Sequence, residues 1–441
     1  MRLSAVEVAA AVSGSIHGNR KTVFTSYHTD SRQVRPGGLF FALRGSETDG
    51  HRFARSAVEA GAAGVVVDRA LRTQASVAVI KVADTWAALY DLAALVRRRV
   101  DPLVFGITGS NGKTSTKEMV AAALGVRHHV LKTEGNLNTE TGLPLTVLRL
   151  EPDHSALALE MGMQGPGEIA RLAQLARPQV GVITTIGTVH LEYFDSREAL
   201  ARAKGELAAA LPETGRAVLP AESEYLELLR GLTRAPVVTF GAGGDYEVER
   251  YRPEGSGCAF EVRGAEVRLA LGGRHMATNA TAALAAAEYG GVPVDEGARA
   301  LAAVQVDQRL QEHATRDGYR LVDDSYNASP ESMLAAFDTV AERPHQRLLA
   351  VLGEMRELGS VAEESHREVG RRAAEVFDAV AVVDVGLGRL TAEAAGNKAD
   401  LIDKPAAAGW VREHARPGDV VLIKASHGVH LEELVAELLA G

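Results

Sequence analysis

The sequence Gly106-Ile-Thr-Gly-Ser-Asn-Gly-Lys-Thr-Ser-Thr116 joins an apolar run at residues 103–108 to a run with helical spacing at residues 113–124. A strand, a turn with glycines and a helix in this order bring backbone N–H groups and a helix N-terminus to one point. Because that arrangement binds phosphate oxygens, the stretch predicts a phosphate-binding loop within an α/β fold.

Individual residues of this loop fit the phosphates of a nucleotide. Gly112 lets the backbone approach closely, the Lys113 ammonium can reach the β and γ phosphates, and the Thr114 hydroxyl suits Mg²⁺. The spacing departs from the strict P-loop, because Ile107 stands where that motif has glycine. We therefore predict an ATP site, whose loop residues are Thr108, Gly109, Ser110, Asn111, Gly112, Lys113 and Thr114.

Strand-like and helical runs continue to alternate after the loop, which is typical of a parallel sheet with helical crossovers. From residue 246 to residue 271 the pattern changes to short alternating strands, and a helical run at 278–289 follows. The strand-like runs of the expected parallel sheet are at residues 103–108, 156–160 and 180–184, and the helical runs are at 113–124, 168–175 and 197–211.

A chain of 441 residues suits two or three domains. Before the loop, Arg97-Arg-Arg-Val-Asp101-Pro102 is expected to break a helix that starts at residue 85 and to mark a boundary. The predicted fold is α/β with three domains: a small amino-terminal α/β domain at 1–100, a central domain with a P-loop ATPase-like parallel sheet at 101–313, and a carboxyl-terminal Rossmann-like α/β domain at 314–441. Further strands are expected at 39–43, 64–67, 77–82, 319–322, 348–352, 379–383 and 420–423, and helices at 53–60 and 85–96.

Three ionisable residues follow the expected central strands. Glu160 ends an apolar strand, His190 follows another, and Lys204 lies in a helix. Because the carboxyl ends of parallel strands share one edge of a sheet, Glu160 and His190 can face a bound triphosphate, which makes a metal site plausible. The simpler alternatives are a solvated loop carboxylate for Glu160, a hydrogen-bonded turn histidine for His190, and a surface lysine for Lys204.

The composition argues against several classes of partner. Acidic residues outnumber basic ones by 57 to 48, and the basic residues are scattered, so no nucleic-acid partner is expected. The sequence shows neither a secretion signal nor an apolar run of membrane-spanning length, so we expect a cytoplasmic protein without a membrane span. The single cysteine, Cys258, is expected to pack in the interior.

Four motifs in order resemble the Mur ligases of bacterial cell-wall synthesis, and the similarity extends over essentially the whole chain. They are the phosphate loop at 108–114, Gly135-Asn-Leu-Asn-Thr-Glu-Thr-Gly-Leu-Pro144, His190-Leu-Glu192 and Ala203-Lys-Gly-Glu206. The amino-terminal motifs Asp30-Ser-Arg32 and Asp49-Gly-His51 belong to the same pattern.

Carboxyl-terminal motifs resemble the branch of the family that adds a dipeptide. These motifs are Asp323-Asp-Ser-Tyr-Asn-Ala-Ser-Pro330-Glu-Ser-Met333, the stretch at 351–359 and Val421-Leu-Ile-Lys-Ala-Ser426. Relatives that add one amino acid, and folylpolyglutamate synthases, usually carry histidine where this chain has Asn327. The resemblance implies ATP-dependent joining of D-alanyl-D-alanine to UDP-N-acetylmuramoyl-tripeptide. It also implies that the protein is a monomer.

The same resemblance implies roles for individual residues. Asn279, Arg309 and Asp324 are similar to nucleotide-binding positions. Lys204 matches a lysine that relatives carbamylate, which would make it an anion able to help bind Mg²⁺. The implied catalytic residues are Lys113, His190 and Lys204, the implied metal ligands are Thr114, Glu160, His190 and Lys204, and the implied substrate-binding residues are Ser31, Arg32, Asp49, Asn136, Asn138, Thr139, Asn327 and Ser329.

Four positions depart from the family pattern. Met276 and Thr185 stand where relatives often have asparagine, and Ala425 and His427 stand where glycine and arginine are usual.

The resemblance implies that the first domain binds the UDP-sugar peptide and that the third binds the dipeptide and closes on ATP. Two alternatives remain open: a sister ligase that adds a single amino acid, and a non-catalytic ATP-binding regulator.

The implied reaction passes through an acyl phosphate, which the neutral amine of the dipeptide attacks. The base that would deprotonate this amine is not singled out by spacing. Three histidines are candidates: His190, His427 and His430.

Overall fold

The computed structural model describes residues 1–45, 48–71 and 74–440. The described chain forms two compact units, of which the first contains residues 1–106, 128–163 and 168–179. The second contains residues 107–127 and 164–167 and the chain from residue 180 onward.

The amino-terminal part of the first unit is a five-stranded sheet with the strand order β2-β7-β6-β5-β4. Strand β2 is antiparallel to β7, and the other pairs are parallel. The strands are β2 (Ser15–Gly18), β4 (Ser26–His28), β5 (Gly38–Phe41), β6 (Gly64–Val67) and β7 (Ala78–Lys81), and the small pair β1 (Leu3–Ser4) and β3 (Val23–Phe24) lies beside α1 (Ala5–Ala11). The predicted small α/β arrangement is confirmed here.

Helix α2 spans Ala54–Glu59, and helix α3 spans Thr85–Val100. The prediction that the arginines from Arg97 onward break α3 was wrong, because arginine is a good helix former and the helix continues to Val100. It ends where Asp101 adopts a left-handed conformation (φ +50°) and its N–H bonds to the Arg97 carbonyl, just before Pro102.

The division between the units passes through β8 (Leu103–Thr108), which belongs to a six-stranded sheet of order β13-β12-β11-β8-β10-β9. The pairs β9–β10, β11–β12 and β12–β13 are parallel, as predicted for this segment. The other strands are β9 (Val130–Lys132), β10 (Ala156–Glu160), β11 (Val180–Ile183), β12 (Arg216–Pro220) and β13 (Val237–Phe240). The helices of this segment are α4 (Lys113–Leu124), α5 (Gly142–Val147), α6 (Glu168–Ala176), α7 (Arg197–Ala209) and α8 (Leu226–Leu232).

The expected short strands form an antiparallel three-stranded sheet of β14 (Glu249–Glu254), β15 (Gly257–Val262) and β16 (Ala265–Leu269). Helix α9 (Arg274–Tyr289) follows and packs against α4, and α10 (Val294–Leu301) packs against both of these helices. Cys258 is buried in β15, where its Sγ lies 3.4 Å from the Leu271 carbonyl oxygen, and burial raises the pKa of its thiol to about 12.

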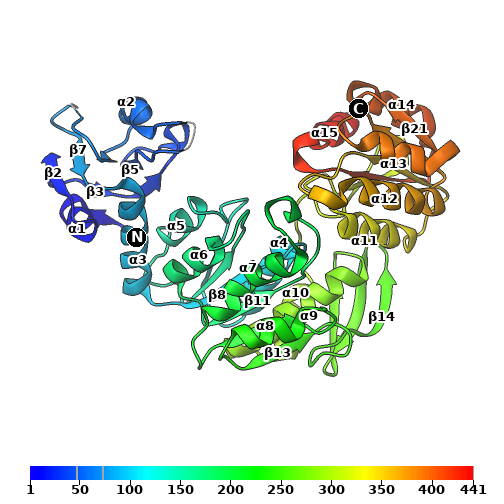
Figure 1. Ribbon diagram of the computed structural model, residues 1–441, viewed down its shortest axis with the longest axis horizontal. Helices are drawn as coiled ribbons and strands as arrows, with labels where there is room; N and C mark the ends of the chain where they lie inside the picture. Colours follow the sequence, from blue (N-terminus) through cyan, green and yellow to red (C-terminus); the bar gives the residue numbers. More distant parts are fainter. Residues whose placement is uncertain (46–47, 72–73, 441) are drawn as a thin grey trace. The chain divides into compact units, whose positions relative to one another are not determined.

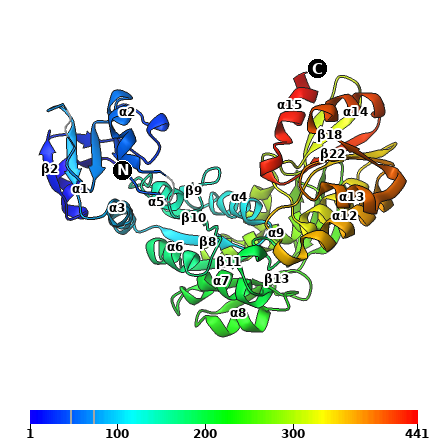
Figure 2. The same cartoon turned by 45° about the horizontal axis from the view of Figure 1, so that its top comes forward.

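The carboxyl-terminal sheet has the strand order β17-β18-β22-β19-β20-β21 and is parallel except for β17. Helices α14 and α15 lie on one side of β18 and β22, and α12 and α13 lie on the other (Figure 2). The elements are β17 (Gln311–Ala314), β18 (Arg320–Asp323), α11 (Pro330–Ala341), β19 (Leu348–Leu352), α12 (Ala362–Val376), β20 (Ala379–Val383), α13 (Gly388–Ala395), β21 (Ala399–Ile402), α14 (Ala407–His414), β22 (Val420–Lys424) and α15 (Glu432–Ala440) (Figure 1).

This sheet is covered on both faces, which explains why its strands are continuous apolar runs. Val351 and Ile423 lie in one core cluster with Trp410 and Leu434 from the covering helices. Each such buried aliphatic side chain contributes about 1.5–3 kcal/mol relative to exposure. Among the helices of the described chain, none combines the length and apolar character needed to cross a membrane.

Candidate nucleotide-binding site

The phosphate loop turns sharply between the end of β8 and the start of α4, and two of its glycines are required by geometry. Gly109 has φ +147°, and a Cβ placed on it would lie 1.9 Å from the Thr184 hydroxyl oxygen. Gly112 has φ +81°, and its Cβ would lie 2.6 Å from Oδ1 of Asn279. Larger residues would therefore displace the loop from the segments that pack against it.

The segment that follows β11 fixes the shape of the loop through hydrogen bonds. The Thr184 hydroxyl donates to the Asn111 carbonyl at 2.5 Å, and the Asn111 N–H donates to the Thr185 hydroxyl at 2.9 Å. The Ser110 hydroxyl accepts from the Gly187 N–H at 2.8 Å. The loop is therefore held in one conformation by neighbouring backbone and hydroxyl groups, which reduces the entropy cost of binding an anion.

Two lysine ammonium groups meet at the same carbonyl of this loop. Lys113 Nζ donates to the Gly109 oxygen at 2.8 Å and to the Ser110 oxygen at 3.1 Å. Lys204 Nζ, from α7, donates to the Gly109 oxygen at 3.2 Å. Burial, together with the nearby charge of Lys113, holds the pKa of Lys204 well below its usual range. The surface-lysine interpretation of Lys204 was wrong, because its residue is only 1% exposed.

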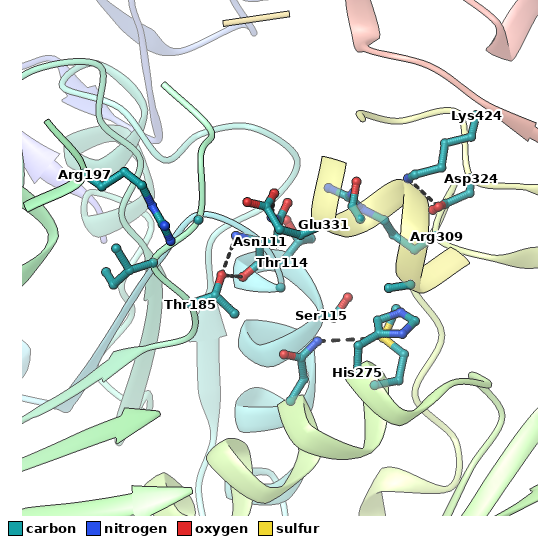
Figure 3. Close-up of a pocket in the computed structure, with 17 residues that line it drawn as sticks. Asn111, Thr114, Ser115, Thr185, Arg197, His275, Arg309, Asp324, Glu331 and Lys424 are labelled. Atoms are coloured by element: carbon teal, nitrogen blue, oxygen red, sulfur yellow. Dashed lines mark hydrogen bonds and ion pairs between the residues drawn. The ribbon is translucent and has the colours of Figure 1, made fainter. Parts of the chain in front are cut away.

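A pocket of about 370 Å³ opens beside the loop (Figure 3). It brings the predicted residues Asn279, Arg309 and Asp324 together with the loop residues Asn111 and Thr114. Its volume lies within the range of small-molecule sites. The remaining lining residues are Gly112, Ser115, Thr185, Ile186, Gly187, Arg197, His275, Met276, Glu331, Ser332, Ala335 and Lys424.

A buried ion pair forms one wall of this pocket. Lys424 Nζ lies 2.5 Å from Oδ2 of Asp324 and donates to the Asn327 carbonyl at 3.0 Å. Burial lowers the pKa of Lys424, and the neighbouring Asp324 carboxylate opposes that shift. The Arg309 guanidinium lies over the Tyr326 ring, 4.4 Å from its centroid. Sequence reasoning quoted the motif containing Lys424 but assigned the lysine no role.

Three further residues, His275, Met276 and Thr185, line the pocket. His275 is partly buried, and desolvation lowers its pKa to about 4, so its imidazole is neutral at ordinary pH. The departures Met276 and Thr185 both line the pocket. The Thr185 hydroxyl hydrogen-bonds the loop at Asn111, so it has a structural function at the position where asparagine is common.

His190 lies in the loop before α7 with a left-handed backbone (φ +68°). Its Nδ1 is 2.5 Å from Oε2 of Glu357, which comes from the loop after β19. The nearby His190 imidazole lowers the pKa of Glu357. Sequence reasoning did not assign a role to Glu357, although it lies in one of the quoted motifs.

Glu160 ends β10 and is only 3% exposed, so the solvated-loop interpretation was wrong. Its backbone N–H donates to the Thr133 hydroxyl at 3.0 Å, and its Oε1 accepts from Asn138 Nδ2 at 2.8 Å. The predicted substrate residues Asn136 and Thr139, on either side, are exposed. Glu160 and Asn138 thus form one polar group within the first unit.

The amino-terminal candidates lie in two short turns. Asp30 caps the turn Ser31–Gln33 and pairs with Arg32 at 2.8 Å, and the Arg32 side chain is 87% exposed. Asp49 accepts from the His51 backbone N–H at 3.0 Å, from the His51 ring at 2.8 Å and from Arg69 at 2.6 Å, and these partners lower the pKa of its carboxyl. The Arg32 guanidinium is therefore accessible, whereas Asp49 is held in a local network.

The carboxyl-terminal candidates Asn327 and Ser329 precede α11. Asn327 is exposed. Ser329 is buried, caps α11 through the Ser332 N–H, and donates to Asn111 Oδ1 at 3.0 Å. The structure thus places the Ser329 hydroxyl against the phosphate loop.

Known proteins match this chain over most of its length. The Mur ligase middle domain matches residues 107–287, the Mur ligase glutamate ligase domain matches 308–427, and the Mur ligase family catalytic domain matches 24–97. The chain is 36% identical to UDP-N-acetylmuramoyl-tripeptide–D-alanyl-D-alanine ligase of Bacillus subtilis (strain 168), covering 98% of this chain and 97% of that protein. It is also 36% identical to the Escherichia coli (strain K12) protein of the same name, covering 93% and 92% of the two chains.

Solved structures give the same relationship. MurF from Acinetobacter baumannii is similar with a TM-score of 0.90 at 30% identity, covering 100% of this chain and 99% of that one. MurF ligase from Thermotoga maritima in complex with ADP has a TM-score of 0.84 at 30% identity, with coverage of 94% and 97%. The chain therefore belongs to the Mur ligase family.

Proposed function

We propose that this chain is an ATP-dependent ligase that joins D-alanyl-D-alanine to UDP-N-acetylmuramoyl-tripeptide, giving UDP-N-acetylmuramoyl-pentapeptide, ADP and phosphate. The observation that carries the proposal is the pocket in which the phosphate loop meets Asn279, Arg309 and Asp324. The substrates are supported by relatives named for this reaction that match over nearly their whole length.

The loop is suited to the chemistry of the first step. The tripeptide carboxylate attacks the γ phosphate, both groups are anionic, and two like charges ~4 Å apart repel by about 4 kcal/mol at intermediate dielectric. The Lys113 ammonium and the N–H groups at the start of α4 offset this repulsion. This attack releases ADP and leaves an acyl phosphate. The neutral amine of the dipeptide then attacks the acyl carbon, phosphate leaves, and the nitrogen loses a proton.

The residues also suit Mg²⁺. The Thr114 hydroxyl and the Glu160 carboxylate are hard oxygen donors of the kind that Mg²⁺ prefers, and His190 and a modified Lys204 would complete the proposed ligand set. When bound, Mg²⁺ neutralises negative charge on phosphate and carboxylate oxygens. Hydrogen bonds to the Gly109 and Ser110 carbonyls position the Lys113 ammonium beside the same loop.

We propose that Lys204 is carbamylated by CO₂. Its amine is buried against the Gly109 carbonyl close to a second lysine, and a carbamate would convert this crowded cation into an anion. We expect protein equilibrated with ¹³C-bicarbonate to give a carbamate carbon signal by NMR that is lost in Lys204→Arg. An unchanged spectrum in that variant would contradict the modification.

The proposal also gives each of the three predicted domains a ligand. Residues 1–100 would bind the UDP-sugar peptide, in which the exposed Arg32 suits an anionic group. Residues 101–313 would bind ATP, and residues 314–441 would bind the dipeptide and close on ATP, with Asp324 reaching the nucleotide. We place the reaction in the cytoplasm, where ATP is available, and expect the protein to act as a monomer.

The proposal is tested by phosphate release from ATP in the presence of UDP-N-acetylmuramoyl-tripeptide. We expect turnover with D-alanyl-D-alanine and little with D-alanine, L-lysine or diaminopimelate. Turnover selective for a single amino acid would assign the chain to a sister ligase. Nucleotide binding without turnover for any donor would favour a regulator.

A further inference from the structure

A carboxylate from the carboxyl-terminal segment lines the pocket beside the phosphate loop. Glu331, in the first turn of α11, accepts from both the N–H and the hydroxyl of Thr188 through Oε1, each at 3.0 Å. Its Oε2 accepts from Asn111 Nδ2 at 3.4 Å. Figure 3 shows Glu331 beside Asn111 and Thr114. A negative charge is thus fixed inside the pocket proposed to receive a polyphosphate.

The carboxylate is held in place by more than one restraint. A Cβ on Gly187 would lie 2.8 Å from Glu331 Oε1, so the side chain packs closely against this backbone. The N-terminus of α11 favours a negative charge at this point. Ser329, two residues earlier, donates to Asn111 Oδ1 at 3.0 Å and fixes the same end of the helix against the loop. Glu331 cannot turn away without losing several of these contacts.

A polyphosphate at the start of α4 brings negative oxygens into the same pocket. These oxygens and the Glu331 carboxylate carry like charges, so they repel one another. A divalent cation on the phosphates weakens this repulsion, because the carboxylate then faces a site of reduced negative charge. The effect of Glu331 on binding must therefore depend on whether the nucleotide carries a metal.

We propose that Glu331 is a specificity-determining residue that rejects metal-free nucleotide and so restricts the pocket to the divalent-cation complex. The inference rests on the proposed nucleotide site. Glu331 belongs to the sequence motif at 323–333, and the proposed reaction gives it no role.

The test measures dissociation constants of ADP and of a non-hydrolysable ATP analogue by calorimetry, once with excess MgCl₂ and once with EDTA. Glu331→Gln keeps the size of the side chain and an oxygen that can accept from Thr188. We expect this variant to bind metal-free nucleotide about tenfold more tightly than the unmodified chain, because one repulsion is removed. With MgCl₂ its affinity should change less than about threefold.

The matched control is Glu363→Gln, which removes a carboxylate from α12 that pairs with Arg367 outside the pocket. It should leave both constants unchanged, and melting temperatures should show that all three proteins are folded. Equal affinity of Glu331→Gln and the unmodified chain under EDTA would overturn the inference. So would weaker binding only with MgCl₂, since that would make Glu331 a metal ligand. Absence of nucleotide binding by the unmodified chain would instead contradict the proposed function.

Discussion

Gly109→Ala is expected to abolish nucleotide binding. The added Cβ would lie 1.9 Å from the Thr184 hydroxyl oxygen and 3.0 Å from the Thr185 nitrogen. Thr184 cannot yield freely, because its hydroxyl bonds to the Asn111 carbonyl at 2.5 Å and to the Thr108 carbonyl at 3.2 Å. The φ of +147° adds backbone strain for any residue other than glycine. The loop must therefore leave the conformation in which its N–H groups converge.

We expect the affinity of Gly109→Ala for the ADP–Mg²⁺ complex to fall at least about 100-fold, and its unfolding free energy to fall by about 2–4 kcal/mol. Calorimetry and denaturant unfolding measure the two effects. The matched control is Gly231→Ala in α8, where a Cβ would meet nothing within 4 Å. This change should leave binding intact and stabilise the helix by up to about 1 kcal/mol. Normal nucleotide affinity in Gly109→Ala would show that the loop does not hold the phosphates.

Lys113→Ala is expected to lower kcat/KM for phosphate release by about 10²–10³-fold. The Lys113 ammonium can stay in contact with the γ phosphate while that group is transferred, and so can stabilise its negative charge. Lys113 Nζ donates to two carbonyls of its own loop, those of Gly109 and Ser110.

Lys113→Arg should not restore activity, because the planar guanidinium is larger than the ammonium and presents its donors in a fixed fork. The melting temperature of both variants should stay within a few degrees of that of the unmodified chain, which separates a catalytic loss from unfolding. Turnover of Lys113→Ala within tenfold of the unmodified chain would exclude the proposed role of this lysine.

The phosphate loop and its flanking elements were predictable because local chemistry determines them. Strand β8 and helix α4 have the expected bounds, since a buried strand is a continuous apolar run and Gly112 marks the start of the helix. The three-domain α/β class followed from the same alternation of strands and helices. Strands β12 and β13 and helices α8 and α10 were not predicted, because none of them is longer than 8 residues and so short a run gives a weak signal.

Burial and long-range contacts were harder to predict. Helix α7 carries alanines and a glycine around Lys204, so no stripe of large apolar residues revealed that this face is buried. Glu331 reaches Asn111 across 220 residues, and Lys424 reaches Asp324 across 100. Such pairs depend on how sheets pack, which spacing along the chain does not encode. The resemblance to the Mur ligases predicted a role for Asp324 but none for Glu331 or Lys424.

The proposed function requires the chain to form one specific peptide bond while it hydrolyses ATP to ADP and phosphate. Mass spectrometry of a reaction containing UDP-N-acetylmuramoyl-tripeptide, D-alanyl-D-alanine and ATP tests it directly. We expect a nucleotide product whose mass rises by that of the dipeptide less one water, with one ADP formed for each product. Consumption of ATP with the tripeptide mass unchanged, or a gain of a single amino acid from a mixed pool of donors, would contradict it.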